Sequence, residues 1–545
     1  MTQNAPTPRD SASPTAYDAD TAGRLARAAL SVVAAACVAA FGVNVFFGLG
    51  FGPLVSFGPV AGLIAALACR SVLDAAAAGA VNAVAGTLLA QAVFPHPWPA
   101  TSGWVGTMLT VALVAAVVGA GAAWVLGRSP NLATVFSALA LALILAACTL
   151  NGLTTAAQPR SAVWVTGAPG SALSLSDALN SPATQSAVSP DETIYLFVVQ
   201  QLARGSSYYP SMVQALADDN RVHTDGNVPL DQPTSYRMPT LFWVLAALPQ
   251  SGAIPLVELC LGALAAVGAY LLARRFVVAP LALVGATGVA AYTASIAATP
   301  AVLYVELWAG LLGLIAVAVF VRSRQGTRVT MVLQLAAAFA ALLAALVREL
   351  AVGFVAAGTI ATLADPELRR KRVWIAWAGA LALALAAFAL HWRSALAAFS
   401  ASGAPSGSVS AAARFPWFHP DGSGLVYAVR LTQAALQWNA VAVYAAIAVC
   451  VLGALIIEGD LGTRVMLGLT CAAGVALLAI VRAPGVNADS VLAGYWGMVV
   501  VPTALACFPL AFSRLDVARA ETARPDESAA GATLGHAETQ ADGGA

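Results

Sequence analysis

The chain contains 545 residues, of which 59% are hydrophobic and only 10% are charged, and its mean hydropathy is +0.79. Soluble proteins contain about 45–50% apolar and about 25% charged residues, so this composition excludes a soluble multidomain protein and a disordered chain. The net charge of +1 leaves no broad basic face for nucleic acid. The composition therefore predicts an all-α polytopic membrane protein whose main partner is the lipid bilayer.

Apolar stretches separated by Arg clusters and Gly-Pro breaks predict the spans. A transmembrane helix needs about 20 predominantly apolar residues, and stretches of about that length predict about fourteen spans. They cover 28–48, 52–69, 74–94, 104–127, 132–150, 254–273, 277–298, 302–321, 330–347, 349–364, 373–392, 438–457, 464–482 and 491–512. An even number of spans places both termini on one side of the membrane.

Basic residues set the expected orientation, because short cytoplasmic loops are enriched in Lys and Arg. With the N-terminus inside, the inner segments carry 18 basic residues and the outer segments carry 9. We therefore expect a multi-pass protein of the cell (plasma or inner) membrane with both termini in the cytoplasm. The two long loops, 151–237 and 393–424, would then lie outside the cytoplasm.

The same pattern divides the chain into four regions. Polar tails are expected to be disordered in the cytoplasm at both ends, and an N-terminal four-helix membrane extension precedes a larger membrane core. Within the extension, Gly58 and Gly62 form a GxxxG motif that predicts close helix packing. The regions are 1–24 (tail), 25–128 (extension), 129–514 (core) and 515–545 (tail).

The first long loop contains an amphipathic segment whose start and end are visible in the sequence. Ser189 or Asp191 can cap its first turn, and Gly205 can end it. The helix is too short to span a bilayer, so we expect it to lie in the outer interface. Two interpretations of Asp191 and Glu192 stay open: they only stabilise the helix N-terminus, or one acts as a general base at the membrane surface.

Charged residues also occur at the predicted outer membrane boundary, where burying a charge is costly. Glu306 lies just inside a predicted span, and Arg348 and Glu349 lie at a break between two short spans. A functional site and a purely structural ion pair, or snorkelling to water, explain these positions equally well. We interpret Glu258, near the start of another span, as interfacial.

Patterns that suggest a metal are weak. Asp218, Asp219, His223 and Asp225 could be ligands, but their spacing matches no known site, and we interpret them as a solvated turn. The seven cysteines lie in apolar runs without a CxxC pair, which indicates neither a disulfide framework nor a cysteine metal site. His391 is an isolated histidine with no ligand spacing, and it receives no role.

From about Asn131 to Arg514 these features resemble a family. The chain is similar to GT-C-type membrane glycosyltransferases of the dolichyl-phosphate-mannose mannosyltransferase-like and aminoarabinose-transferase-like superfamily, which use lipid-linked sugars. The shared motifs are an acidic pair opening a juxtamembrane helix, a following Tyr, a Leu-Ala-x-Gly ending, an Arg-x-Pro segment and a double-basic inner end. They correspond to Asp191-Glu192, Tyr195, Leu202–Gly205, Arg237–Pro239 and Arg274-Arg275.

Later parts of the chain match the family more loosely. Glu306 stands where many members carry an Asp at the outer start of a later helix, and Arg348 matches a basic residue at a break between short helices. Arg482 and Tyr495 match an Arg and a Tyr at the last outer loop. The chain departs from the pattern in its four extra spans over 28–127, its longer first loop and its Glu at position 306.

The resemblance implies that a sugar is transferred, with inversion, from a polyprenyl-phosphate donor to an extracytoplasmic glycan, lipid or protein. Asp191 would be the general base, with Glu192 and Glu306 as supporting carboxylates. Arg237 and Arg348 would contact the phosphate. The remaining substrate contacts would come from Tyr195, Glu349, Arg482 and Tyr495. The resemblance implies no definite cofactor, although a divalent cation could take part.

Three other functional classes fit the composition. A transporter or flippase would place polar groups on broken helices near the membrane midplane, whereas the acids here gather at the outer boundary. An O-antigen polymerase or ligase would favour Arg-rich outer loops, whereas the outer side carries 9 Arg against 11 acids. A non-catalytic scaffold would leave Asp191 facing solvent with no cavity behind it.

Overall fold

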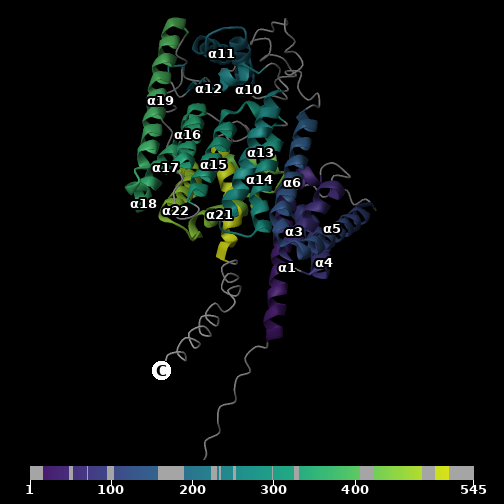
Figure 1. Ribbon diagram of the computed structural model, residues 1–545. Helices are drawn as coiled ribbons and strands as arrows, with labels where there is room; N and C mark the ends of the chain where they lie inside the picture. The colour runs from purple at the N-terminus through teal and green to yellow at the C-terminus, as the bar shows by residue number, and fades with distance from the viewer. Residues whose placement is uncertain are drawn as a thin grey trace, which may run out of the picture.

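The chain is seen in a computed structural model that describes its helices and most of their connections. The described residues are 16–47, 53–69, 71–94, 103–156, 190–222, 230–231, 235–248, 253–297, 299–324, 331–404, 423–480 and 497–514. Within these ranges every regular element is a helix and no β-strand occurs. The longer helices pack side by side in one bundle (Figure 1).

Nine helical segments of the described chain are long and apolar enough to cross a membrane. The chain is therefore an all-α, multi-pass membrane protein, as its composition predicts. The nine are α1 (Ala16–Phe41), α4 (Val72–Val93), α5 (Gly103–Arg128), α6 (Ala133–Ala156), α13 (Ala253–Ala273), α14 (Ala279–Ala297), α15 (Val305–Ser323), α19 (Trp374–Ser402), and the continuous run of α22 (Leu461–Leu467), η8 (Gly468–Ala473) and α23 (Gly474–Ile480).

The other five predicted spans coincide with shorter apolar helices. Because these are at most 17 residues long, the total of fourteen spans stays a prediction. They are α3 (Gly58–Ala68), α16 (Met331–Val347), α17 (Val352–Ala364), α21 (Ala440–Ile456), and α24 (Val501–Cys507) with η10 (Phe508–Phe512).

Glycines bring the helices of the N-terminal extension into close contact. A Cβ atom at Gly62 of α3 would stand 2.6 Å from the carbonyl oxygen of Ala115 on α5. A Cβ at Gly119 of α5 would stand 2.7 Å from the carbonyl oxygen of Ala75 on α4. A side chain at either position would push the helices apart, so the packing predicted from the GxxxG motif is confirmed.

The extension is joined firmly to the rest of the bundle. Its first helix, α1, packs against α14. Between α20 (Ser423–Leu436) and α21, the indole Nε1 of Trp438 donates a 2.7 Å hydrogen bond to the Ala40 carbonyl. The next residue, Asn439, donates its backbone N–H to the Val93 carbonyl at the end of α4, at 2.8 Å. The extension is thus part of the same bundle as the core.

A network of ion pairs ties helix ends together around α18 (Pro366–Arg370). Arg324, which follows α15, lies 3.0 Å from Asp365 and 3.2 Å from Asp460. Arg275, which follows α13, lies 2.9 Å from the same Asp460. Asp460 also caps α22 by accepting the backbone N–H of Thr463. These contacts hold the α18 ends of α13, α15, α17 and α22 in place.

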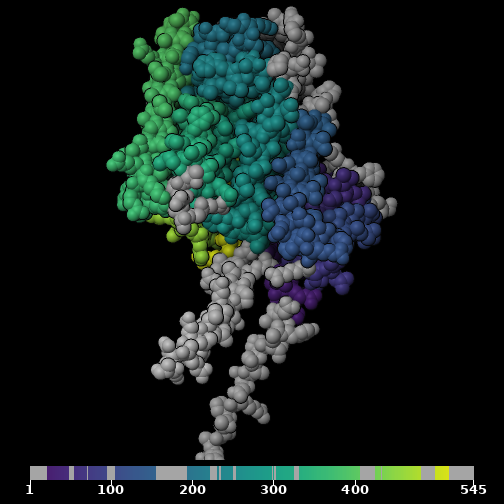
Figure 2. Space-filling model, viewed as in Figure 1, coloured from purple at the N-terminus to yellow at the C-terminus, as the bar shows by residue number. Residues whose placement is uncertain are grey.

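Three helices cover the opposite end of the bundle, and we call them the cap. They are α10 (Pro190–Ala203), α11 (Tyr208–Val222) and α12 (Thr240–Ala246). The cap lies far from α18 and beside the end of α19 (Figures 1 and 2). The helix predicted between Ser189 and Gly205 is confirmed as α10, and Gly205 adopts the left-handed φ of +89° that ends it.

The interpretation of Asp218 and Asp219 as part of a solvated turn is wrong. The second cap helix continues to Val222, so both residues belong to α11, and Asp219 is buried at 7% exposure. The other two residues considered as ligands, His223 and Asp225, lie outside the described residues.

The two ends of the bundle can be assigned to the two sides of the membrane by labelling. Ser400, near the cap end of α19, and Glu458, between α21 and α22, are both exposed. If the cap is extracytoplasmic, as the basic residues predict, Ser400→Cys should react with an impermeant maleimide in intact cells. Glu458→Cys should react only after permeabilisation. A parent carrying Cys260→Ser removes the native thiol that is exposed, and the reverse labelling pattern would invert the orientation.

Candidate functional site

Two charged side chains from distant parts of the chain meet inside the bundle below the cap. Glu306 lies in the first turn of α15, and Arg348 lies between α16 and α17. The Arg348 Nε atom is 2.7 Å from Glu306 Oε1, and these side chains are 3% and 0% exposed. Glu349, which opens the short helix η6 (Glu349–Ala351), forms a second ion pair with Arg348. Glu306, Arg348 and Glu349, which are all predicted at the outer membrane boundary, therefore lie together.

A break in the helix creates the position of Arg348. Its backbone is extended, with φ −145° and ψ 123°, so α16 ends at Val347 and η6 begins at Glu349. The following α17 contains 13 residues, which span about 20 Å at about 1.5 Å per residue. That length is shorter than the roughly 30 Å hydrocarbon core of a bilayer. The guanidinium is therefore recessed within the bundle.

Arg237 supplies a second positive charge to this cluster. Its Nε atom donates a 2.8 Å hydrogen bond to the hydroxyl of Tyr195 on α10, and its charge acts on both Glu306 and Glu349. The backbone of Arg237 is held by the Tyr208 hydroxyl, which donates to its carbonyl oxygen. We call Glu306, Arg348, Glu349 and Arg237 the charged cluster.

The positive and negative charges of the charged cluster balance, but several of its carboxylate oxygens lack a hydrogen-bond donor among the described residues. Two carboxylates face two guanidinium groups, which offsets much of the cost of burying them. Both carboxylate oxygens of Glu306 and one of Glu349 are nevertheless buried and accept no hydrogen bond of good geometry from the described residues. Buried acceptors normally find a donor. The cluster can therefore take a hydroxyl donor at the carboxylates or an anion at the arginines.

The predicted acidic pair belongs to α10, which contacts the charged cluster through the hydrogen bond from Arg237 to Tyr195. Asp191 and Glu192 are in the first turn of α10, although their side chains lie outside the described residues. Helix α10 packs against η5 (Pro300–Leu303), and η5 leads directly into the start of α15 at Glu306. The remaining predicted contacts, Arg482 and Tyr495, also lie outside the described residues.

Two aromatic residues, Tyr209 and His391, lie beside the charged cluster, and neither was predicted to do so from the sequence. His391 of α19 is buried at 3% exposure, and its Nδ1 atom lies 3.1 Å from the Tyr209 hydroxyl. Glu349, Arg237 and Arg348 all act on this histidine electrostatically. Burial raises the pKa of both Tyr208 and Tyr209 above the ordinary value, so their hydroxyls stay protonated. A lone histidine in an apolar helix offers no sequence signal for such a contact.

Glu258 differs from its interpretation as an interfacial residue. It lies in α13 with 0% exposure, and neither of its carboxylate oxygens accepts a hydrogen bond from the described residues. The reason is that α13, which begins five residues earlier, packs against α14 and α15. No charged partner from the described chain acts on Glu258.

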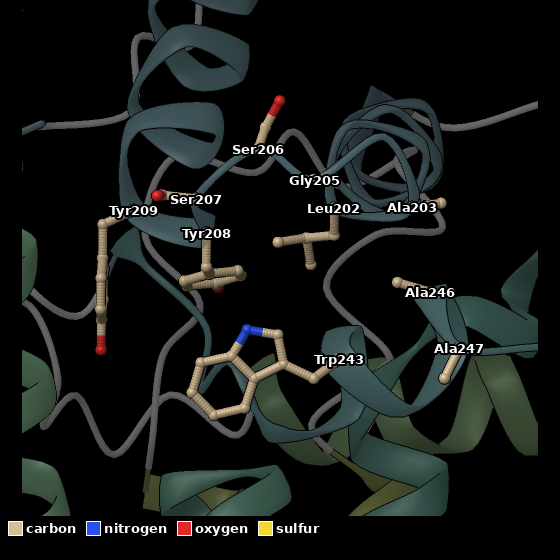
Figure 3. A pocket seen from close by; sticks show the side chains of 10 residues that line it. All are labelled: Leu202, Ala203, Gly205, Ser206, Ser207, Tyr208, Tyr209, Trp243, Ala246 and Ala247. Atoms are coloured by element: carbon tan, nitrogen blue, oxygen red, sulfur yellow. The ribbon is translucent and has the colours of Figure 1, made fainter.

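An open pocket of about 600 Å³ lies in the cap between α10, α11 and α12. The rings of Tyr208 and Trp243 and the side chain of Leu202 converge on it (Figure 3). Ser206 and Ser207 lie on the connection from α10 to α11 that borders it. The rest of the lining comes from Ala203, Gly205, Tyr209, Ala246 and Ala247.

No group of three or more His, Cys, Asp or Glu side chains comes together within the described chain. At the charged cluster, Glu306 and Glu349 both pair with Arg348, and that guanidinium already supplies the positive charge that a cation would bring.

No family model matches the chain, and no curated protein or solved structure matches it at a significant level. The resemblance to GT-C-type glycosyltransferases therefore depends on the short motifs in the sequence. The function has to be argued from the charged cluster and the cap.

Proposed function

We propose that the protein is a membrane glycosyltransferase that moves a sugar from a polyprenyl-phosphate donor to an extracytoplasmic acceptor. The observation that carries this proposal is the charged cluster, in which the buried pair of Glu306 and Arg348 is joined by the half-buried Glu349 and Arg237. Gathering four charges around one buried point is costly. A structural ion pair needs only two of them, so the additional pair of charges favours a binding site.

The two arginines suit the phosphate of the donor. A guanidinium can form two parallel hydrogen bonds to phosphate oxygens, which are strong because both groups are charged. When the sugar leaves, negative charge grows on the lipid phosphate, and Arg237 and Arg348 would stabilise it in the transition state. Their recessed position also suits a donor whose isoprenoid tail remains in the bilayer.

The carboxylates suit the acceptor. In an inverting transfer, the acceptor oxygen forms a bond to the anomeric carbon as the bond from that carbon to the phosphate oxygen breaks. The acceptor hydroxyl loses its proton to Asp191, the proposed base in the first turn of α10. Glu192 and Glu306 would orient the hydroxyl, and the lipid phosphate leaves with the electron pair of the broken bond. Tyr195 and Glu349 hold the two arginines in place.

A second candidate function has one observation in its favour. Glu258 is a buried carboxyl within a predicted span, and it has no partner among the described residues. Ionisable groups inside a membrane commonly mark transport pathways, so a flippase or transporter could use such a group. The buried carboxylates of Glu306 and Asp365, in contrast, lie at opposite ends of the bundle, and each pairs with an arginine; this arrangement favours the enzyme.

Proteoliposomes distinguish the two functions. The purified protein is given radiolabelled polyprenyl-phosphate sugars and a panel of glycan acceptors, and both sugar transfer and transbilayer movement of the lipid are measured. We expect transfer, and we expect Arg237→Ala to reduce it by about 100-fold or more because a charge-assisted phosphate contact is lost. The matched control is Arg204→Ala, an exposed arginine at the end of α10, which should keep normal activity. Lipid movement without transfer would replace the enzyme with a flippase.

A further inference from the structure

The pocket in the cap has a lining suited to an uncharged ligand with both apolar and polar surfaces. None of its ten lining residues is charged. Aromatic and aliphatic side chains form its walls, and serines border it. Its volume of about 600 Å³ falls within the range of roughly 300–1,000 Å³ usual for small-molecule sites. A phosphate group would find no positive partner among these residues.

An exposed tryptophan is the main binding surface of the pocket. Trp243 is 55% exposed, although a ring of this size normally buries most of its area. Its ring faces Tyr208 and Leu202 across the open space (Figure 3). A sugar ring combines a face of C–H groups with a rim of hydroxyls. The C–H face can pack on the indole, and the hydroxyls can bond to the bordering polar groups.

The pocket shares a wall with the charged cluster. Tyr208 lines the pocket with its ring and donates its hydroxyl to the Arg237 carbonyl on the other side. Tyr209 likewise lines the pocket and contacts His391 through its hydroxyl. Only the side chains of Tyr208 and Tyr209 would therefore separate a molecule held in the pocket from the proposed reaction centre.

We infer that this pocket is the subsite for sugar residues of the acceptor, next to the residue that receives the new sugar. The inference rests on the proposed function, because the phosphate of the donor is assigned to the arginines and its tail to the bilayer. The pocket is open, uncharged and carried by the cap, which is where a glycan acceptor would approach. An isoprenoid chain would require a wall without serines and an opening into the lipid.

A protection experiment tests binding without relying on activity. Ser206 is exposed beside the pocket and Ser400 is exposed on α19, so Ser206→Cys and Ser400→Cys are a matched pair. Labelling by a maleimide is timed with and without mannose, galactose or arabinose oligosaccharides, and separately with polyprenyl phosphate. We expect at least one oligosaccharide to slow labelling of the Ser206→Cys protein about threefold or more, with no change at Ser400→Cys. Protection by polyprenyl phosphate alone, or no protection by any probe, would overturn the inference.

Kinetics of the full-length enzyme separate this inference from the proposed function. Trp243→Ala should raise the KM for a glycan acceptor about tenfold and leave the KM for the donor unchanged, whereas Trp243→Phe should keep most of the affinity. Trp124→Ala, at a tryptophan 52% exposed on α5, is the control. If the wild-type protein transfers sugar but Trp243→Ala has a normal acceptor KM, only the subsite is wrong. If oligosaccharides protect the Ser206→Cys protein from labelling but no sugar is transferred, only the proposed function is wrong.

Discussion

Asp191→Asn should abolish most sugar transfer while the protein stays folded in the membrane. The amide has the size of the carboxylate and caps a helix about equally well, so α10 should keep its place. It cannot accept the proton of the acceptor hydroxyl, and loss of a general base lowers the rate by about 10²–10⁴-fold. The measurement is single-turnover transfer from a polyprenyl-phosphate sugar in proteoliposomes.

The neighbouring carboxylate provides the control for this prediction. Glu192→Gln removes the adjacent negative charge of the same helix turn and should reduce transfer much less, because Glu192 is expected only to orient the hydroxyl. Near-normal turnover by Asp191→Asn together with a large loss in Glu192→Gln would move the role of base to Glu192. Near-normal turnover by both variants would assign it to Glu306.

Arg348→Ala should both destabilise the protein and remove its activity. The substitution leaves the fully buried Glu306 facing no direct partner, and breaking a buried ion pair on one side typically costs about 3–5 kcal/mol. Thermal unfolding in detergent should show a clear fall in midpoint. Arg393→Ala, at an exposed arginine of α19, should unfold like the wild-type protein.

A double variant separates stability from function at this position. In Arg348→Met with Glu306→Gln, neither member of the buried pair is left as an uncompensated charge, and the charge of Arg237 still acts on Glu349, the other partner of Arg348. Such replacements often recover the stability that a single substitution loses. The double variant should therefore regain most of the unfolding midpoint but still fail to transfer sugar. Recovery of transfer along with stability would show that the ion pair is only structural.

Features that depend on local pattern can be predicted from the sequence. The apolar stretches correspond to helices because each must satisfy its own backbone hydrogen bonds in lipid. Helix α10 is predictable between Ser189 and Gly205 because capping residues and a terminal glycine mark its ends. The pairing of Glu306 with Arg348 is one of the interpretations that the sequence leaves open, since charges in an apolar setting need a partner.

Features that depend on tertiary packing cannot be predicted in this way. His391 and Trp243 carry no motif, and their contacts with Tyr209 and the cap pocket arise only when α11, α12 and α19 come together. Hydropathy places Glu258 near a span end and so suggests an interfacial residue, while its burial depends on how α13 packs against α14 and α15. The sequence also does not show that, within the described residues, five apolar stretches form helices of at most 17 residues.

Photo-crosslinking tests most directly whether the charged cluster holds the phosphate of a lipid donor. A polyprenyl phosphate with a diazirine beside the phosphate is added to proteoliposomes and irradiated, and the adducts are mapped by mass spectrometry. The account predicts adducts on peptides that contain Arg237 and Arg348, and their loss when unmodified polyprenyl phosphate competes. Adducts confined to the ion-pair network around Arg324 and Asp365 at the α18 end, or adducts insensitive to the competitor, would contradict it.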